Sequence, residues 1–161
     1  MLSSDELNLQ FTGWAPVERD VFLEWDLEST PLMVRTNSVL GSDDGVWVDL
    51  FSAGGESAGR VNLRFTVTHL LKYYLHWCSS TWNILPVTAP SANEKDWRIT
   101  LTRTAGVRLV IIFCNDVEVL NTLLSQATCG SNERNTYWSR DVTKIKFGIH
   151  DTASDYYKAG D

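Results

Sequence analysis

The chain has 161 residues, of which 43% are hydrophobic and 21% charged, and its formal net charge is −6 at pH 7. This composition excludes a disordered or low-complexity chain and predicts one globular domain over residues 1–161. The acidic charge argues against nucleic acid as a partner, and since the longest apolar run, Val107 to Cys114, is far shorter than the roughly 18 residues of a membrane helix, we expect no membrane insertion.

Apolar and polar residues alternate with a period of two along most of the chain, which predicts an all-β protein. The first expected strand places Val21, Leu23, Trp25 and Leu27 on one face and Glu24, Asp26 and Glu28 on the other. Further strands are expected over residues 46–51, 61–67, 72–78, 97–101, 107–113, 118–120 and 144–150. Eight or nine strands without intervening helices indicate an antiparallel jelly roll or β-sandwich.

Two of these segments predict finer features. Residues 107–113 are almost wholly apolar, as is typical of a central strand that is covered on both faces. The four residues that follow, Cys114-Asn115-Asp116-Val117, favour a hairpin turn into the next strand.

Two acidic loops are candidate calcium sites because Ca²⁺ takes six to eight oxygen ligands from flexible, carboxylate-rich loops. The first loop contains Asp43 and Asp44 before Gly45, and the second contains Asp151 and Asp155 after His150. Asp is also common in ordinary turns, which is the alternative interpretation of both loops. The pair Asn115-Asp116 is a third and weaker candidate.

Carbohydrate binding requires an aromatic ring for the apolar face of a sugar and polar side chains for its hydroxyl groups. Of the seven tryptophans, Trp25, Trp77 and Trp97 fall on apolar strand faces and are expected in the core, whereas Trp82 and Trp138 lie in polar, loop-like surroundings. We therefore predict Trp82 and Trp138 as sugar platforms. The polar residues expected beside them are Asn83, Asn62, Arg64 and His150, with Arg60 on the same strand face as Asn62 and Arg64.

An enzymatic alternative rests on Glu24-Trp25-Asp26-Leu27-Glu28, which resembles the E-x-D-x-E signature of jelly-roll glucanases. These enzymes use a pair of carboxylates, but residues 24 and 28 of a regular strand are about 13 Å apart, which exceeds the separation that either glycosidase mechanism uses. We therefore expect a protein that binds sugar without hydrolysing it. A hydrolase of β-glucan and a structural or adhesion module remain the alternatives.

The three cysteines, Cys78, Cys114 and Cys129, allow one internal disulfide and one spare thiol, or three buried thiols. The N-terminal residues show no signal peptide, so a secreted protein would have lost its signal.

The second half of the chain resembles a family of cnidarian β-sandwich proteins that includes calcium-dependent, galactose-specific lectins. The resemblance lies in Trp97-Arg98-Ile99, in Val110 to Val119, and in the tail segments Lys144 to Phe147 and Asp151 to Tyr157. It implies a secreted, disulfide-linked homodimer that binds terminal β-linked galactose, as in lactose-like glycans, through Ca²⁺. We expect Cys78, at the end of a strand, to form the intermolecular bridge.

A looser resemblance is to the galectins, whose strand motif is similar to Asn62-Leu63-Arg64-Phe65. The chain departs from that pattern in two places. Arg60 replaces a histidine two residues before Asn62, and Trp82 is not followed by glycine and glutamate. These departures argue against a galectin-type site without metal.

Overall fold

The computed structural model describes residues 13–17, 22–37, 45–65, 70–74, 83–88, 94–104, 107–123, 141–149 and 155–160. Within these ranges every regular element is a β-strand, which confirms the all-β prediction. The strands are β1 (Ala15–Pro16), β2 (Leu23–Glu24), β3 (Leu32–Asn37), β4 (Gly45–Phe51), β5 (Ser57–Phe65), β6 (Leu70–Tyr74), β7 (Asn83–Thr88), β8 (Glu94–Thr104), β9 (Val107–Cys114), β10 (Val117–Leu123), β11 (Lys144–Ile149) and β12 (Asp155–Ala159). None of the described segments forms a helix with the length and apolar character that crossing a membrane requires.

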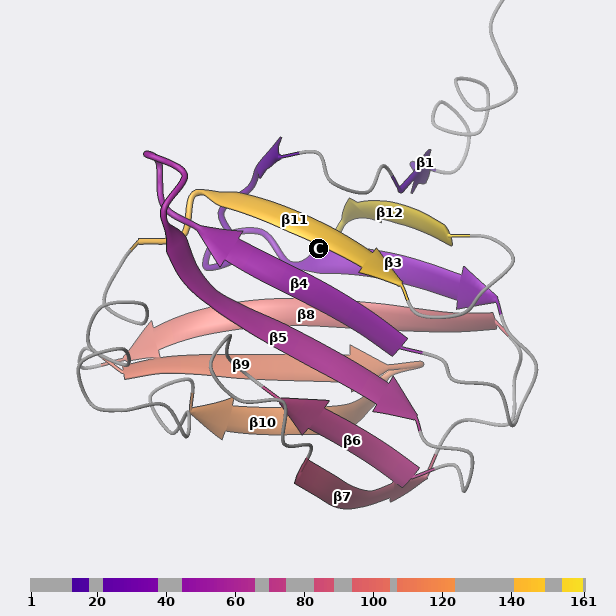
Figure 1. Ribbon diagram of the computed structural model, residues 1–161. Coiled ribbons are helices and arrows are strands. Elements are labelled where there is room, and N and C mark those ends of the chain that lie inside the picture. The colour runs from indigo at the N-terminus through magenta and orange to yellow at the C-terminus, as the bar shows by residue number, and fades with distance from the viewer. Residues whose placement is uncertain are drawn as a thin grey trace, which may run out of the picture.

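The strands form two six-stranded antiparallel sheets, as a β-sandwich requires. Sheet 1 has the order β1-β12-β3-β8-β9-β10, and sheet 2 has the order β2-β11-β4-β5-β6-β7. Figure 1 shows β4, β5 and β11 of sheet 2 crossing in front of β3 and β8 of sheet 1. Non-consecutive strands are neighbours in both sheets, so the contacts that hold them together are mostly long-range.

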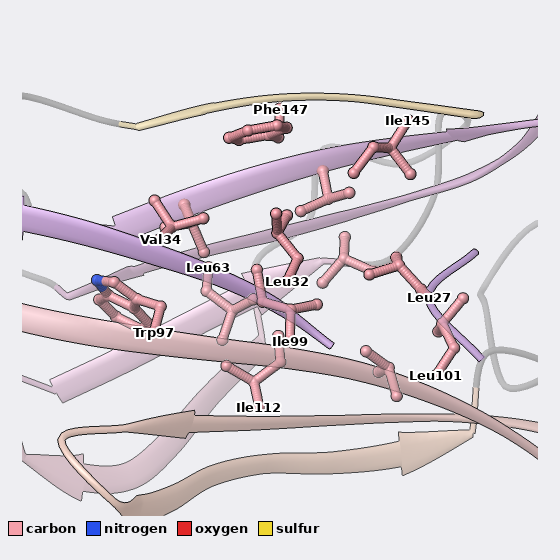
Figure 2. Packing of buried hydrophobic residues seen from close by; sticks show 14 of the residues in the cluster. Leu27, Leu32, Val34, Leu63, Trp97, Ile99, Leu101, Ile112, Ile145 and Phe147 are labelled. Carbon is pink, nitrogen blue, oxygen red and sulfur yellow. The ribbon is translucent and has the colours of Figure 1, made fainter. Parts of the chain in front are cut away.

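The core lies between the two sheets and is built from the inward positions of alternating strands. Figure 2 shows Leu32, Val34, Trp97, Ile99 and Ile112 of sheet 1 together with Leu63, Ile145 and Phe147 of sheet 2, and each of these side chains is at most 2% exposed. The ring nitrogen of the buried Trp97 donates to Thr36 Oγ1 at 3.1 Å, so its one polar atom is satisfied. The period-two pattern therefore identified the core face of these strands correctly.

The turn between β9 and β10 is a two-residue hairpin, as its sequence predicts. Asn115 and Asp116 have φ values of 49° and 65°, the left-handed pair that such hairpins require. Asn115 is also held by its side chain, whose Oδ1 accepts from the Asp96 amide at 2.8 Å and whose Nδ2 donates to the Glu94 carbonyl at 3.3 Å. The described role of Asn115 and Asp116, the third and weaker calcium candidate, is therefore to form the hairpin turn.

The predicted strand carrying three carboxylates on one face is wrong. The described strand comprises Leu23 and Glu24 alone, and the chain then enters a turn in which Asp26 Oδ1 accepts from the Glu28 amide at 3.0 Å. The Asp26 carbonyl accepts from the Thr30 amide at 2.9 Å. Because Asp26 accepts these hydrogen bonds from the amides that follow it, the chain leaves the strand before Glu28. The three carboxylates of the E-x-D-x-E segment therefore do not line one strand face.

The expectation that β9 is covered on both faces is also wrong. Its inward residues Val110, Ile112 and Cys114 are fully buried, but Leu109, Ile111 and Phe113 on the other face are only half-buried. Sheet 1 has no further layer among the described residues, so the outer face of β9 keeps part of its apolar surface exposed.

Candidate functional site

Sheet 2 presents a polar and aromatic outer face on its three adjacent strands β11, β4 and β5. Val46, Val48 and Leu50 of β4 point into the core, so the residues between them point outward, and the same alternation holds in β5 and β11. We call this outer face the Trp47 surface. It comprises Trp47, Asp49 and Phe51 of β4, Arg60, Asn62 and Arg64 of β5, and Lys144, Lys146 and Gly148 of β11.

Trp47 lies across the neighbouring strand on a position without a side chain. Its cross-strand partner on β11 is Gly148, and a Cβ added there would come within 2.6 Å of Cζ2, 2.8 Å of Cε2 and 2.9 Å of Nε1 of the indole. Glycine is therefore needed for the ring to adopt this position. Gly148 is buried beneath the indole, whereas Trp47 itself stays partly exposed.

On its other side Trp47 pairs with Asn62, which places an amide side chain on the same sheet face, across β4 from the strand over which the indole lies. Directly opposite residues of an antiparallel pair have Cβ atoms about 5 Å apart, within the span of one pyranose ring. Asn62 is 7% exposed and pairs on its far side with Tyr74 of β6. Arg64 follows on the same face and pairs with Gly45, where an added Cβ would collide with the Leu63 carbonyl.

The next row of the Trp47 surface is an ion pair. Arg60 donates from Nε to Asp49 Oδ1 at 2.5 Å and from Nη2 to Asp49 Oδ2 at 3.0 Å, and the Asp49 carboxylate is almost fully buried. This two-point geometry orients both side chains. The pair gives the surface a fixed polar edge one row away from Trp47 and Asn62.

An aromatic and lysine group adjoins the ion pair. The Phe22 ring, 46% exposed, meets the Phe51 ring edge to face at 4.8 Å between centroids. Lys146 Nζ lies 4.3 Å from the centroid of Phe22 and 5.8 Å from that of Phe51, and Lys144 Nζ lies 6.0 Å from Phe22. Lys144 also reaches Glu24 Oε1 at 3.8 Å.

The two predicted calcium loops join the sandwich at the same end. Segment 38–44 leads from β3 to β4, and segment 150–154 leads from β11 to β12. Val46 of β4 is opposite Ile149 of β11, and Thr36 of β3 is opposite Asp155 of β12, so the four strand ends that anchor both loops are adjacent in pairs. These ends lie on the right of Figure 1, one residue beyond Trp47 and Gly148.

The structure brings together only part of the predicted sugar site. Asn62 and Arg64 share the Trp47 surface, and Asn83 begins β7 opposite Tyr73, although its side chain is outside the described part of the structure. Trp82, Trp138 and His150 lie outside the described residues. Their roles stay predictions.

The structure does not describe the side chains of the four predicted calcium ligands. Asp43, Asp44 and Asp151 lie outside the described residues, and of Asp155 the structure describes only the backbone at the start of β12. In the ranges that are described, no group of three or more His, Cys, Asp or Glu side chains could hold a metal ion.

Sequence reasoning missed Trp47. The signal was its position between Val46 and Val48, because a tryptophan between two core residues of one strand must point outward. The other described tryptophans are engaged elsewhere. Trp97 is in the core, Trp25 Nε1 donates to the Thr30 carbonyl at 3.0 Å, and Trp14 is 6% exposed.

Trp14 is covered on the outer side of sheet 1 by two cations. The Arg35 guanidinium lies 4.2 Å and Lys158 Nζ 4.8 Å from its ring centroid. Arg35 makes two hydrogen bonds with Asp96, at 2.7 and 3.0 Å, and these bonds raise the pKa of Arg35. Because these charged groups cover Trp14, the outward tryptophan with an accessible ring in the described part of the chain is Trp47.

The comparisons with known proteins are limited to distant similarities between solved structures. No known protein family and no curated protein matches the sequence, so the resemblance to the cnidarian lectins stays a prediction. A tetrameric galectin from the ball sponge Cinachyrella is 14% identical, with 88% of this chain and 95% of that chain covered and a TM-score of 0.47. Sheep galectin-11 is 9% identical, with 88% and 98% covered and a TM-score of 0.46.

A Caenorhabditis elegans galectin is 11% identical, with 92% of this chain and 94% of that chain covered and a TM-score of 0.47. All three scores are below 0.5, so these similarities establish neither a family nor a binding site for this chain.

Proposed function

We propose that this protein binds carbohydrate, with the Trp47 surface of sheet 2 as the binding face. The observation that carries the proposal is the partly exposed indole of Trp47, which lies over Gly148 of β11, together with Asn62, the cross-strand partner of Trp47 on β5. An accessible aromatic ring next to an orienting amide is the combination that sugar recognition uses, because a sugar has both an apolar C–H face and hydroxyl groups.

The polar residues have distinct roles in this proposal. Asn62 can donate and accept at once, which suits a hydroxyl group that does both, and Arg64 supplies donors only. The Arg60–Asp49 pair keeps the neighbouring row rigid, so little side-chain entropy is lost when a ligand binds. We expect galactose as the sugar, because its axial O4 leaves one face of the ring available for stacking on Trp47.

Calcium is part of the proposal through the two acidic loops. Asp43 and Asp44 on one loop and Asp151 and Asp155 on the other would hold the ion. The adjacent anchoring of both loops supports this choice, because the ends of β4 and β11 bring them to the same end of sheet 2 as Trp47. When bound, Ca²⁺ supplies open coordination positions that suit two neighbouring hydroxyl oxygens.

We also propose that the protein is secreted and acts as a disulfide-linked homodimer. Cys114 is fully buried on β9 opposite Trp97, which makes it unsuitable for a bridge to a second chain. This supports Cys78 as the bridging residue, with Cys129 as the alternative. A dimer would present two binding faces, so weak single-site affinity, about millimolar, would be raised by bivalent attachment to a cell surface.

Titration calorimetry with lactose in buffer containing calcium tests the binding face. We expect Trp47→Ala to weaken lactose binding about tenfold, because the apolar sugar face loses its partner. The matched control is Phe113→Ala, which removes a half-buried aromatic from the outer face of the other sheet. Unchanged affinity in Trp47→Ala, or equal losses in both variants, would overturn the proposed face.

A second experiment tests whether lactose binding depends on calcium. Removal of calcium with a chelator is expected to abolish lactose binding, and Asp151→Ala or Asp44→Ala is expected to weaken it while the fold is kept. Full binding in the chelator would reject the calcium part of the proposal and leave the Trp47 surface as a metal-free site. Release of reducing ends from β-glucan, lost in Glu24→Gln, would instead favour the hydrolase alternative.

A further inference from the structure

The Trp47 surface is cationic although the protein as a whole is acidic. The strands β4, β5 and β11 carry five charged residues, namely Arg60, Arg64, Lys144, Lys146 and Asp49, and all five are on the outer face. Four of them are cations, whereas the whole chain has a net charge of −6. The opposite sign of this face calls for a functional explanation.

The single carboxylate of these strands does not neutralise the lysines. Lys146 is directly opposite Asp49, but both oxygens of Asp49 are engaged by Arg60. In the described part of the chain the ammonium of Lys146 contacts the rings of Phe22 and Phe51 instead of a carboxylate. Among the described residues the carboxylate that Lys144 meets is that of Glu24, at 3.8 Å, and the Glu24 side chain is 80% exposed. Two ammonium groups are therefore available to an anionic ligand.

The rings beneath the lysines complete a second place for a saccharide unit. Phe22 and Phe51 offer apolar surface, and the ammonium groups above them offer charge, which is the combination that a sugar carrying an anionic substituent requires. Lys146 precedes Gly148 by two residues on β11, so its backbone lies about 6.7 Å along the strand from the position that Trp47 covers. The two places are thus adjacent along one strand, as neighbouring units of an oligosaccharide would be.

We propose that the physiological ligand is an acidic glycan, in which a sulfate or carboxylate on the unit next to the one stacked on Trp47 is bound by Lys146 and Lys144 over Phe22 and Phe51. This inference rests on the proposed carbohydrate-binding function and specifies the class of glycan. It gives the cationic face a ligand of opposite charge, and the acidic remainder of the protein disfavours binding of other polyanions.

The test compares binding of the full chain to a sulfated galactan, the same galactan after chemical desulfation, and a polyuronate, at low and at high salt. The wild type is expected to bind the sulfated or the uronic polymer about tenfold more tightly than the neutral one, with the difference shrinking at high salt. Comparison of the two acidic polymers identifies which anion the lysines recognise.

Lysine variants assign the preference to this face. Lys146→Gln is expected to lower affinity for the acidic polymer about threefold to fivefold, and the double change with Lys144→Gln about tenfold, while affinity for the neutral galactan is unchanged. The matched control is Lys158→Gln, because Lys158 also lies over an aromatic ring, but on sheet 1. This control is expected to bind all three polymers as the wild type does.

The outcomes separate the inference from the function beneath it. Equal binding to acidic and neutral galactan, with loss in Trp47→Ala, would overturn the acidic ligand and keep the carbohydrate-binding function. Binding to none of the polymers would contradict both. Equally tight binding to double-stranded DNA would overturn the inference, because it would show a general affinity for polyanions.

Discussion

Gly148→Ala isolates the contribution of Trp47 without removing the ring. A methyl group at this position would approach three indole atoms to between 2.6 and 2.9 Å, well inside van der Waals contact. The neighbouring backbone of β4 and β11 is fixed by the strand ladder, so the indole is the group that must rotate away. The ring then leaves its position over β11, while the core under the sheet is untouched.

The expected magnitude follows from the contact that the ring makes. A sugar face stacked on an indole removes about 55 Å² of apolar surface from water, which at about 25 cal/mol per Å² is about 1.4 kcal/mol. This corresponds to about a tenfold loss of affinity. The off-rotamer indole costs about 1 kcal/mol of folding free energy, which lowers the melting temperature by about 2–4 °C in a chain of this size.

Lactose titration and thermal unfolding of Gly148→Ala measure both quantities. Gly54→Ala is the matched control, because the added Cβ would meet only Glu56 Oε1, at 3.8 Å, in an exposed turn. The control should bind as the wild type does. Undiminished lactose binding in Gly148→Ala would refute the assignment of the platform to Trp47, and a loss of stability far above about 1 kcal/mol would show that Gly148 serves the fold instead.

Three further outcomes test other parts of the account. Gly45→Ala should lower the melting temperature by about 5–10 °C, because the added Cβ would collide with the Leu63 carbonyl and come within 2.7 Å of Arg64 Cα. Both are backbone atoms, and an unchanged melting temperature in calorimetry would contradict this contact. Because φ of Asp116 is positive, Asp116→Gly should raise the free energy of unfolding by about 0.5 kcal/mol and Asp116→Val should lower it by about 1–2 kcal/mol. Chemical denaturation measures both values, and the reverse order of stability would reject the turn assignment. On non-reducing gels Cys78→Ser should convert the dimer to monomer; a dimer that persists would move the bridge to Cys129.

Much of the fold follows from the alternation of residues. Val46, Val48 and Leu50, or Trp97, Ile99 and Leu101, identify their inward faces because burial of one sheet face imposes a period of two. The pattern failed at Asp26, where a side chain that bonds its own backbone ended the strand that the alternation continued.

The candidate site was less predictable. Asn62 and Arg64 could be placed on one strand face, but their neighbours Trp47 and Gly148 come from strands far away in the sequence, and only the sheet order brings them together. The polar surroundings of Trp82 and Trp138 in the sequence favour these two residues as sugar platforms. That criterion overlooks a tryptophan that points outward from a strand whose alternate residues form the core.

The most direct test is the response of side-chain N–H signals to lactose in a heteronuclear NMR titration with calcium present, with the Trp47 indole signal assigned through Trp47→Phe. We predict that the largest chemical-shift changes occur at the Trp47 indole N–H and the Asn62 side-chain amide, and that backbone amides of β9 stay unchanged. Large changes along β9 with an unmoved Trp47 signal would place the sugar on the other sheet and contradict the account.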